Sequence, residues 1–510
     1  MMRSPLRLAI SLTLVAAGAV ACSGAPPEEE SGSSESALAK RPPIGRLPPI
    51  IIGPTLPPDP QPPPPPPITI GDANDPATIL ADEKVFWDTY FGGTDDGEVA
   101  YLKSQFAADG SGTPPYWGTG QRIVALVQMY DLLLPIDATV AAKYLSRLRA
   151  IAHALFQMRD DNRVLAHPFI TPTVNAHPVD PFRNRVMPAW GALADDRDGK
   201  WNTDVSTAGL FSYAMAAFAR RVAENPALHT EHGYEAVFLT AAVLDTYEAF
   251  RPEMHLVDSD AEASYRLPTS YAGLQCNSGG GCENYRSAAG QALAWNEGLS
   301  MSKALADIAL AADSALFRSS TAATSLRLDR ATREAPLLIA KSFTFFDHHL
   351  RSKTASDGRP YFEWDHQLPS PARIQDIAHG GFEVGALAVL LEDKIALNAL
   401  LARSGRSEQV GLSSPLFVRF ANTFLVKVWH YDYGNANGLR NVLDRKVDGT
   451  SNPSETVNSN VECAGWIPLA QFDPWIWTRC HDATFHVGGG IQRYLRVDNH
   501  AALLRYRQYH

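Results

Sequence analysis

The chain has 510 residues, a net charge of −10 and only five cysteines. It is longer than one average domain, yet no second low-complexity break divides the part after residue 73, so we expect one large domain at 74–510. The acidic balance and the lack of a basic stripe with interleaved aromatic residues argue against a nucleic-acid partner.

The first 22 residues have the pattern of an export signal. Arg3 and Arg7 precede an apolar run at 8–21 that ends in small residues before Cys22. A run of about 14 residues is shorter than the ~20 that a membrane span needs, so we expect 1–21 to be cleaved. The pattern resembles a bacterial lipoprotein signal, which implies acylation of Cys22. An ordinary signal peptide with a spare cysteine is the alternative.

Ser23, rather than an aspartate, follows Cys22. By the same resemblance, this suggests anchoring to the outer membrane, on its periplasmic or cell-surface face. The lipid would then be the only contact with the membrane. Residues 22–73 are rich in Pro, Glu, Ser and Gly, with six consecutive prolines at 62–67. Such a composition predicts a disordered, semi-rigid linker that holds the domain away from the membrane.

The other four cysteines form an even set, which an oxidising compartment would allow to pair. Cys276 and Cys282 flank a flexible Asn-Ser-Gly-Gly-Gly loop that could close a short bridge, and Cys463 with Cys480 would close a longer one. Other pairings remain open from sequence alone.

The domain is expected to be all-α, because apolar residues recur at spacings of three and four almost throughout. The predicted helices are 122–134, 140–158, 205–223, 234–250, 295–312, 337–350, 377–391, 416–429 and 483–496. Several are apolar over most of their circumference, so other helices must surround them. We therefore expect an alpha/alpha toroid, with an inner ring of helices inside an outer one. An open helical solenoid is the alternative.

Three helix-opening segments combine polar or aromatic residues with small apolar ones, and we expect them to line one mouth. They are 200–209, 294–300 and 373–381. In the third, Asp376 is a good N-cap, and His379 and Glu383 follow near the same helical face. A carboxylate that orients an imidazole beside another carboxylate suits proton transfer. A purely capping Asp376 with His379 in the core is the alternative.

The segment 359–367 leads toward that mouth and gathers aromatic and acidic residues, with Arg373 beyond it. Ring faces stack on sugars, while hydroxyls and carboxylates take charged partners, so this composition suits an acidic polysaccharide. The expected substrate-binding residues are Trp201, Asp204, Trp295, Trp364, Asp365, His366 and Trp466. We expect no cofactor and no metal site, since neighbouring histidines such as His348 and His349 point about 100° apart on a helix.

Four short motifs carry a resemblance to a known group of proteins. They are Trp295-Asn-Glu297, Tyr361-Phe-Glu-Trp364, Gln375-Asp-Ile-Ala-His379-Gly and Gly465-Trp-Ile-Pro-Leu469. In this order they resemble secreted bacterial proteins of the six-hairpin glycosidase-like superfamily, over most of residues 190–480. The resemblance implies an alpha/alpha toroid and either a polysaccharide lyase or a glycoside hydrolase. It describes the scaffold better than the reaction.

Two enzyme hypotheses follow, and the lyase is favoured. In the lyase, Asn296 and Arg373 would neutralise a uronate carboxylate, His379 or Tyr361 would remove the neighbouring proton, and Tyr361 could protonate the leaving oxygen. In the hydrolase, two of the carboxylates Asp204, Glu297, Glu363 and Asp376 would act as acid and base. The third hypothesis is a non-catalytic glycan-binding lipoprotein that uses its tryptophans. In every case a polysaccharide is the partner, and the protein is expected to be a monomer.

Overall fold

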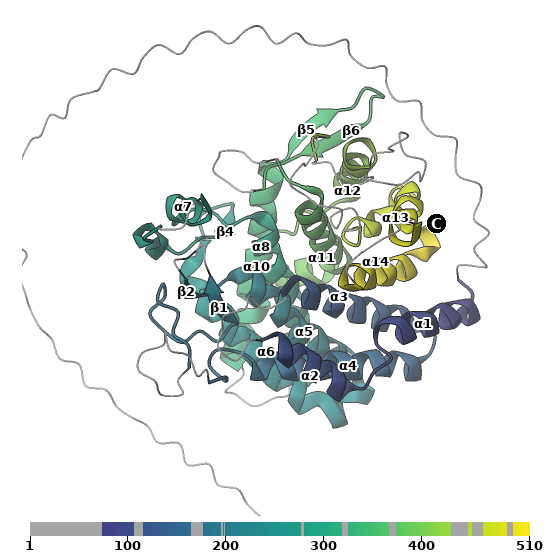
Figure 1. Ribbon diagram of the computed structural model, residues 1–510, viewed down its shortest axis with the longest axis horizontal. Coiled ribbons are helices and arrows are strands. Elements are labelled where there is room, and N and C mark those ends of the chain that lie inside the picture. Colours follow the sequence, from purple (N-terminus) through teal and green to yellow (C-terminus); the bar gives the residue numbers. More distant parts are fainter. Residues whose placement is uncertain are drawn as a thin grey trace, which may run out of the picture. The chain divides into compact units, whose positions relative to one another are not determined.

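The described residues of the computed structural model are mainly helical, which confirms the all-α class (Figure 1). They are 74–106, 116–164, 177–194, 197, 199–276, 280–318, 325–366, 374–429, 447–450, 463–486 and 493–510. Predictions for residues 1–73, which include Cys22, and for Arg373 lie outside this part of the chain. No helix within it is both long and apolar enough to span a membrane.

The helices are distributed along the whole described chain. The α-helices are α1 (Pro76–Tyr90), α2 (Asp95–Gln105), α3 (Tyr116–Leu133), α4 (Ala138–Gln157), α5 (Val205–Glu224), α6 (His229–Phe250), α7 (Gly280–Ser287), α8 (Trp295–Ala312), α9 (Ala315–Arg318), α10 (Ser325–His348), α11 (Ile377–Arg403), α12 (Ser414–Thr423), α13 (Trp475–His486) and α14 (Arg493–Arg505). The shorter turns include the 3-10 helices η3 (Arg251–Glu253), η4 (Thr269–Gly273) and η7 (Ile467–Gln471). Most predicted helices are present, whereas α1, α2, α7 and α9 were not predicted. The predicted helix 483–496 overlaps the end of α13 and the start of α14.

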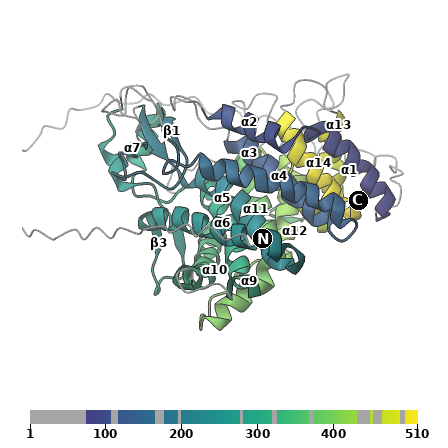
Figure 2. The same cartoon turned by 90° about the horizontal axis from the view of Figure 1, so that it is seen from below.

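Three short antiparallel hairpins interrupt the helices. β1 (Gly191–Ala194) pairs with β2 (Lys200–Thr203), β3 (Met254–Leu256) with β4 (Ala263–Tyr265), and β5 (Arg351–Thr354) with β6 (Pro360–Glu363). In the first hairpin Gly191 lies opposite Thr203, the residue before the N-cap of α5. Figures 1 and 2 both show α7 beside this hairpin. The hairpin thus leads the chain directly into the start of α5.

Five helices pack against one another through the middle of the fold: α5 contacts α3 and α8, α8 contacts α11, and α3 contacts α14. The short helix η7 contacts both α11 and α14. Other helices also pack against these, α4 and α6 on α5 and α10 on α8. Almost every residue of α5 is buried, as expected for a helix that is apolar around its circumference and covered on every side.

The close approach of α5 and α8 depends on Gly209. A Cβ atom at this position would lie 2.4 Å from the backbone nitrogen of Met301 and 2.5 Å from Ser300 Oγ. These distances are shorter than any van der Waals contact, so only glycine allows the two backbones to pack this closely. The register between α5 and α8 is therefore set by a residue without a side chain.

Both expected cysteine pairs are bonded. Cys276 is joined to Cys282, and Cys463 to Cys480. The first bridge ties the residues before α7 to its first turn, and the second joins the segment before η7 to α13. The sequence-based pairing is confirmed.

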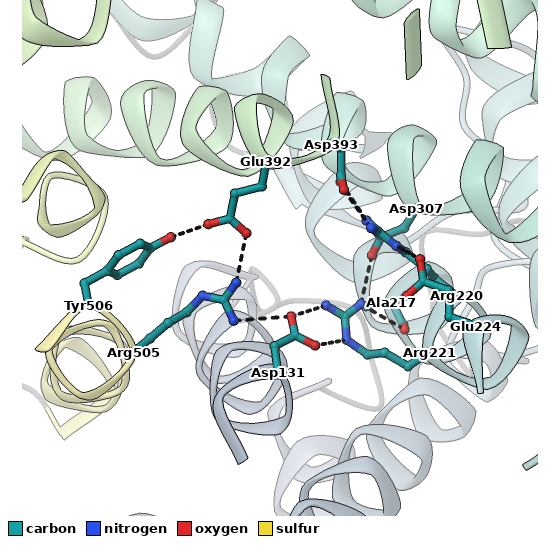
Figure 3. A network of polar contacts seen from close by, with 10 residues as sticks. All are labelled: Asp131, Ala217, Arg220, Arg221, Glu224, Asp307, Glu392, Asp393, Arg505 and Tyr506. Atoms are coloured by element: carbon teal, nitrogen blue, oxygen red, sulfur yellow. Dashed lines mark hydrogen bonds and ion pairs between the residues drawn. The ribbon is translucent and has the colours of Figure 1, made fainter. Parts of the chain in front are cut away.

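A network of largely buried ion pairs connects the five central helices (Figure 3). Arg220 of α5 contacts Asp307 of α8 at 2.8 Å and Asp393 of α11 at 2.6 Å. Arg221 contacts Asp131 of α3 at 2.6 Å. The same Asp131 also lies 3.6 Å from Arg505 of α14, so every central helix contributes a charged side chain.

We expect Asp307→Ala to lower the free energy of unfolding by about 1.5 to 3 kcal/mol, because it removes a buried carboxylate that pairs with both guanidinium groups, although Arg220 keeps Asp393 and Arg221 keeps Asp131. Glu224→Ala provides the matched control. Glu224 also contacts Arg220, at 2.7 Å, but its side chain is 52% exposed, so the cost should stay below about 1 kcal/mol. Urea unfolding measures both. Equal losses in the two variants would contradict the structural role of the network.

Candidate functional site

The starts of α5, α8 and α11 bring three ionisable side chains together. Asp204 is the N-cap of α5, Glu297 lies in the first turn of α8, and His379 in the first turn of α11. The charges of Asp204 and His379 both act on the Glu297 carboxyl. Ser300 Oγ donates to Ser206 O at 3.2 Å and so joins α5 to α8 near these residues. We call the group formed by Asp204, Glu297 and His379 the mouth.

The imidazole of His379 is oriented by Asp376. Asp376 Oδ1 caps α11 by accepting from the His379 backbone nitrogen at 3.0 Å, and its Oδ2 lies 2.7 Å from His379 Nδ1. Burial opposes the negative charge of Asp376, but hydrogen bonding to His379 and its positive charge lower the pKa of this carboxyl to about 2. The ionised carboxylate favours a proton on Nδ1, which makes Nε2 the basic nitrogen of the ring.

A second layer of hydrogen bonds supports this dyad. Gln375 Oε1 accepts from the backbone nitrogen of Asp376 at 3.0 Å and lies 3.1 Å from His366 Nδ1. Gln375 Nε2 donates to Glu383 Oε1 at 2.5 Å. Trp364 Nε1 donates to the other oxygen of Glu383 at 2.6 Å. Glu383, which was expected near His379, is fully buried and accepts from Gln375 and Trp364, and the charge of His379 acts on its carboxyl.

Glu297 combines partial exposure with an unusual protonation equilibrium. Its enclosure by protein and the nearby negative charge of Asp204 raise the pKa of Glu297 to about 7, although Arg197 and His379 oppose the shift. A carboxyl of this kind is protonated in a large fraction of molecules at neutral pH. It can therefore donate a proton, as a general acid must.

Arg197 is a site residue that sequence reasoning missed. Its guanidinium lies 3.2 Å from the ring centroid of Tyr285 in α7 and 5.7 Å from that of Tyr271. Tyr271 Oη in turn donates to Asn202 Oδ1 of β2 at 2.6 Å. Residues distant in the sequence thus place this cation close enough to act on Glu297. No local motif around Arg197 indicates the arrangement.

The four tryptophans do not fit their expected role as stacking surfaces for sugars. Trp201, Trp295, Trp364 and Trp466 are at most 6% exposed. Each indole nitrogen donates to a protein acceptor, such as Asp160 for Trp201 at 2.8 Å and the backbone oxygen of Ile377 for Trp466 at 3.2 Å. We correct the expectation: these rings are part of the core that positions the mouth, because burial of their large apolar area outweighs exposure to a ligand.

Other expected site residues are engaged in contacts of their own. Tyr361 Oη donates to Glu363 Oε1 at 3.0 Å, and burial together with this bond raises the pKa of Tyr361 to about 12. Asp365 forms an ion pair with Arg351 at 2.6 Å. Asn296 is buried, and its Oδ1 accepts no hydrogen bond from the described residues. Among these side chains, Asn296 thus has a buried oxygen that is not satisfied by the described residues.

His366, Asp376 and His379 are the residues of the described chain that could hold a metal ion. One donor atom from each lies within 4.8 Å of the others. Two imidazoles and a carboxylate are a ligand set that zinc accepts. In the structure, Nδ1 of both histidines is already within hydrogen-bond distance of Gln375 or Asp376, so the geometry equally suits a hydrogen-bonded cluster.

A small cavity of about 60 Å³ lies among the central helices and η7. Lys303 and Asp498 line it, and burial lowers the pKa of Lys303 to about 8 and raises that of Asp498 to about 7. Lys303 is six residues beyond Glu297, about 9 Å along α8. This volume suits water-sized molecules and not a sugar ring. Ala378 and Gly381, close to His379 in the first turns of α11, also line the cavity.

Glu297 should make stability depend on pH. Its pKa is raised in the folded state, so stability is fully present below the ordinary value of 4.5 and falls as pH rises to about 7. We expect Glu297→Gln to remove this loss and to unfold at higher urea than the wild type at pH 8, but not at pH 4. Glu231→Gln, at a side chain that is 78% exposed, is the control. A Glu297→Gln effect of the same size at both pH values would refute the assignment.

Comparisons with known proteins do not identify this chain. No family model, curated protein or solved structure matches it. Its site therefore has to be interpreted from its own geometry.

Proposed function

We propose that the central helices form an alpha/alpha toroid. The contacts run from α14 through α3, α5 and α8 to α11, and η7 joins α11 back to α14, which would close the ring. The outer helices on α5 and α8 correspond to an outer layer. In such a ring the starts of α5, α8 and α11 share one end, and the ion pairs in Figure 3 lie at the other.

We further propose that the mouth cleaves an acidic polysaccharide by β-elimination. The observation that carries this proposal is the pairing of an Asp376-oriented His379 with a protonatable Glu297. His379 Nε2 would take the proton from the carbon next to the uronate carboxylate. The electron pair forms the carbon–carbon double bond, the glycosidic carbon–oxygen bond breaks, and Glu297 gives its proton to the leaving oxygen.

The proposed roles differ in part from those expected from sequence. Glu297 replaces Tyr361 as the acid, because the Tyr361 hydroxyl already donates to Glu363. Arg197 is the described cation near Glu297 that can neutralise the uronate, with Asn296 as a further candidate and Arg373 outside the described residues. A binding protein needs no oriented imidazole, so the Asp376–His379 contact favours an enzyme over a non-catalytic glycan-binding lipoprotein.

A glycoside hydrolase is the second candidate, and one observation supports it. The negative charge of Asp204 contributes to the raised pKa of Glu297, and a pair of carboxyls is what hydrolysis of a glycosidic bond requires. In this reaction Glu297 would still be the acid, with Asp204 as base or nucleophile. The two reactions differ in their products, since only elimination creates an unsaturated uronate.

The location is proposed on chemical grounds. Two disulfides in the described chain are compatible with an oxidising compartment outside the cytoplasm. We propose an exported lipoprotein that is anchored through Cys22 and acts as a monomer on a polysaccharide. The anchor is its contact with the membrane.

Activity should require both proposed proton-transfer groups. We expect Glu297→Gln and His379→Ala each to lower the rate about 10²-fold to 10⁴-fold. Uronate-containing and neutral polysaccharides are incubated with each protein, and the ultraviolet absorbance of unsaturated uronate and new reducing ends are recorded together.

Glu231→Gln and His348→Ala, at exposed positions, should retain full activity. Reducing ends without absorbance would replace elimination by hydrolysis. Wild-type activity in both mouth variants would refute the site, as would a wild type that cleaves none of the polymers.

The dependence of the cleavage rate on pH should reflect the interaction between Asp204 and Glu297. The rate should fall as pH rises above about 7, because Glu297 loses the proton that it donates. Asp204→Asn removes a negative charge, so the pKa of Glu297 should fall and the alkaline limb should move to lower pH. Asparagine still caps α5, which preserves the helix start. An unchanged limb, or one moved to higher pH, would contradict the coupling.

A further inference from the structure

A second concave surface lies next to the mouth and has no role in the reaction proposed above. It has a volume of about 570 Å³ and is lined by the residues before β1, by η3 and β3, and by the segment that leads into η4. We call it the arginine groove and define it by Phe182, Arg183, Arg185, Glu253 and Arg266. Its volume is within the range of about 300 to 1,000 Å³ that is usual for ligand sites.

The charges of the groove do not cancel. Glu253 directs both its oxygens to Arg183, at 2.5 and 2.9 Å, and Asp180 behind the groove contacts the same guanidinium at 2.5 Å. Arg185 and Arg266 are exposed, and within the described chain neither forms a direct ion pair with a carboxylate. Arg185 donates one hydrogen bond to the backbone oxygen of Ala249, and its charge acts on Glu253 without direct contact. At the edge, His255 and Asp260 contact each other at 3.1 Å. Three guanidinium groups, of Arg183, Arg185 and Arg266, thus face the two carboxylates of Glu253 and Asp180, so the groove keeps one excess positive charge on a protein whose net charge is −10.

Short contacts connect the groove to the mouth. Arg183 Nη1 donates to Thr203 Oγ1 at 3.3 Å, and Thr203 immediately precedes Asp204. Phe182 of the groove also contacts Tyr271, whose ring lies near Arg197, with the two ring centroids 4.8 Å apart. Arg183 of the groove is therefore hydrogen-bonded to the residue next to Asp204 of the mouth.

We propose that the arginine groove binds an anionic segment of a polysaccharide, through carboxylate or sulfate groups held by Arg185 and Arg266. Guanidinium groups bind such planar or tetrahedral anions through paired hydrogen bonds, which lysine cannot reproduce. Phe182 and Pro268 supply apolar surface for the faces of sugar rings. The inference deepens the proposed function, since it names negative charge outside the mouth as a determinant of the substrate class.

The test measures binding in the Glu297→Gln protein, so that it does not depend on cleavage. Affinity electrophoresis with polygalacturonate, a sulfated glycan and neutral dextran gives a dissociation constant for each. We expect the anionic chains to bind and dextran not to bind, with affinity falling as salt rises. Adding Arg185→Ala and Arg266→Ala should weaken binding about fivefold to tenfold, as expected for two exposed charge contacts.

The matched control removes the same charge elsewhere, through Arg318→Ala and Arg333→Ala at exposed helix positions. It should retain the parent affinity. Equal losses of affinity in the two double variants would attribute the effect to net charge alone and overturn the proposal, as would equal binding of dextran.

Preference for polygalacturonate or for the sulfated glycan identifies the anion. Binding to anionic phospholipid vesicles but to no polysaccharide would overturn the proposal in favour of a membrane surface. The same two arginine substitutions are also made in the protein that retains Glu297. If they weaken binding but leave cleavage intact, the groove and the proposed reaction are shown to be separable.

Discussion

The structure depends on the ion pairs that Arg220 and Arg221 form with Asp131, Asp307 and Asp393. Burying so many charges costs solvation free energy, which the helices recover only if all partners keep their positions. A network of this kind tolerates little sliding of one helix along another. Because each helix is rigid, fixing its position in the network also fixes its N-terminal start. The starts of α5, α8 and α11 carry Asp204, Glu297 and His379.

The mouth itself is built on opposing electrostatic demands. Asp376 is held as a carboxylate by the hydrogen bond and charge of His379, whereas Glu297 is pushed toward its neutral form by burial and by Asp204. Two carboxyls near one imidazole thus acquire different protonation states at the same pH. This separation supplies a base and an acid without any residue outside the three helix starts.

The three-and-four spacing of apolar residues predicted most of the helices. The segments of α5, α8 and α11 are apolar around most of their circumference, so they can be buried only if other helices pack on all sides. The N-cap role of Asp376 and its contact with His379 were likewise local enough to be read from four residues. The tryptophans were misjudged because sequence does not distinguish an indole that stacks on a ligand from one that donates to Asp160 or Glu383. Arg197 was missed because Tyr285 and Tyr271, which position it, are brought near only by tertiary packing. Lys303 did leave a signal, as a lone cation within an apolar helix.

The Cys276–Cys282 bridge has a consequence for how the protein must be produced. It fastens the first turn of α7, the short helix that carries Tyr285 and thereby the surface on which Arg197 lies. In a reducing cytosol Cys276 and Cys282 would remain reduced thiols, and a helix as short as α7 has little stability of its own. Protein folded there would keep its central helices but lose the support of the cation beside Glu297, so preparations for assay require oxidative folding.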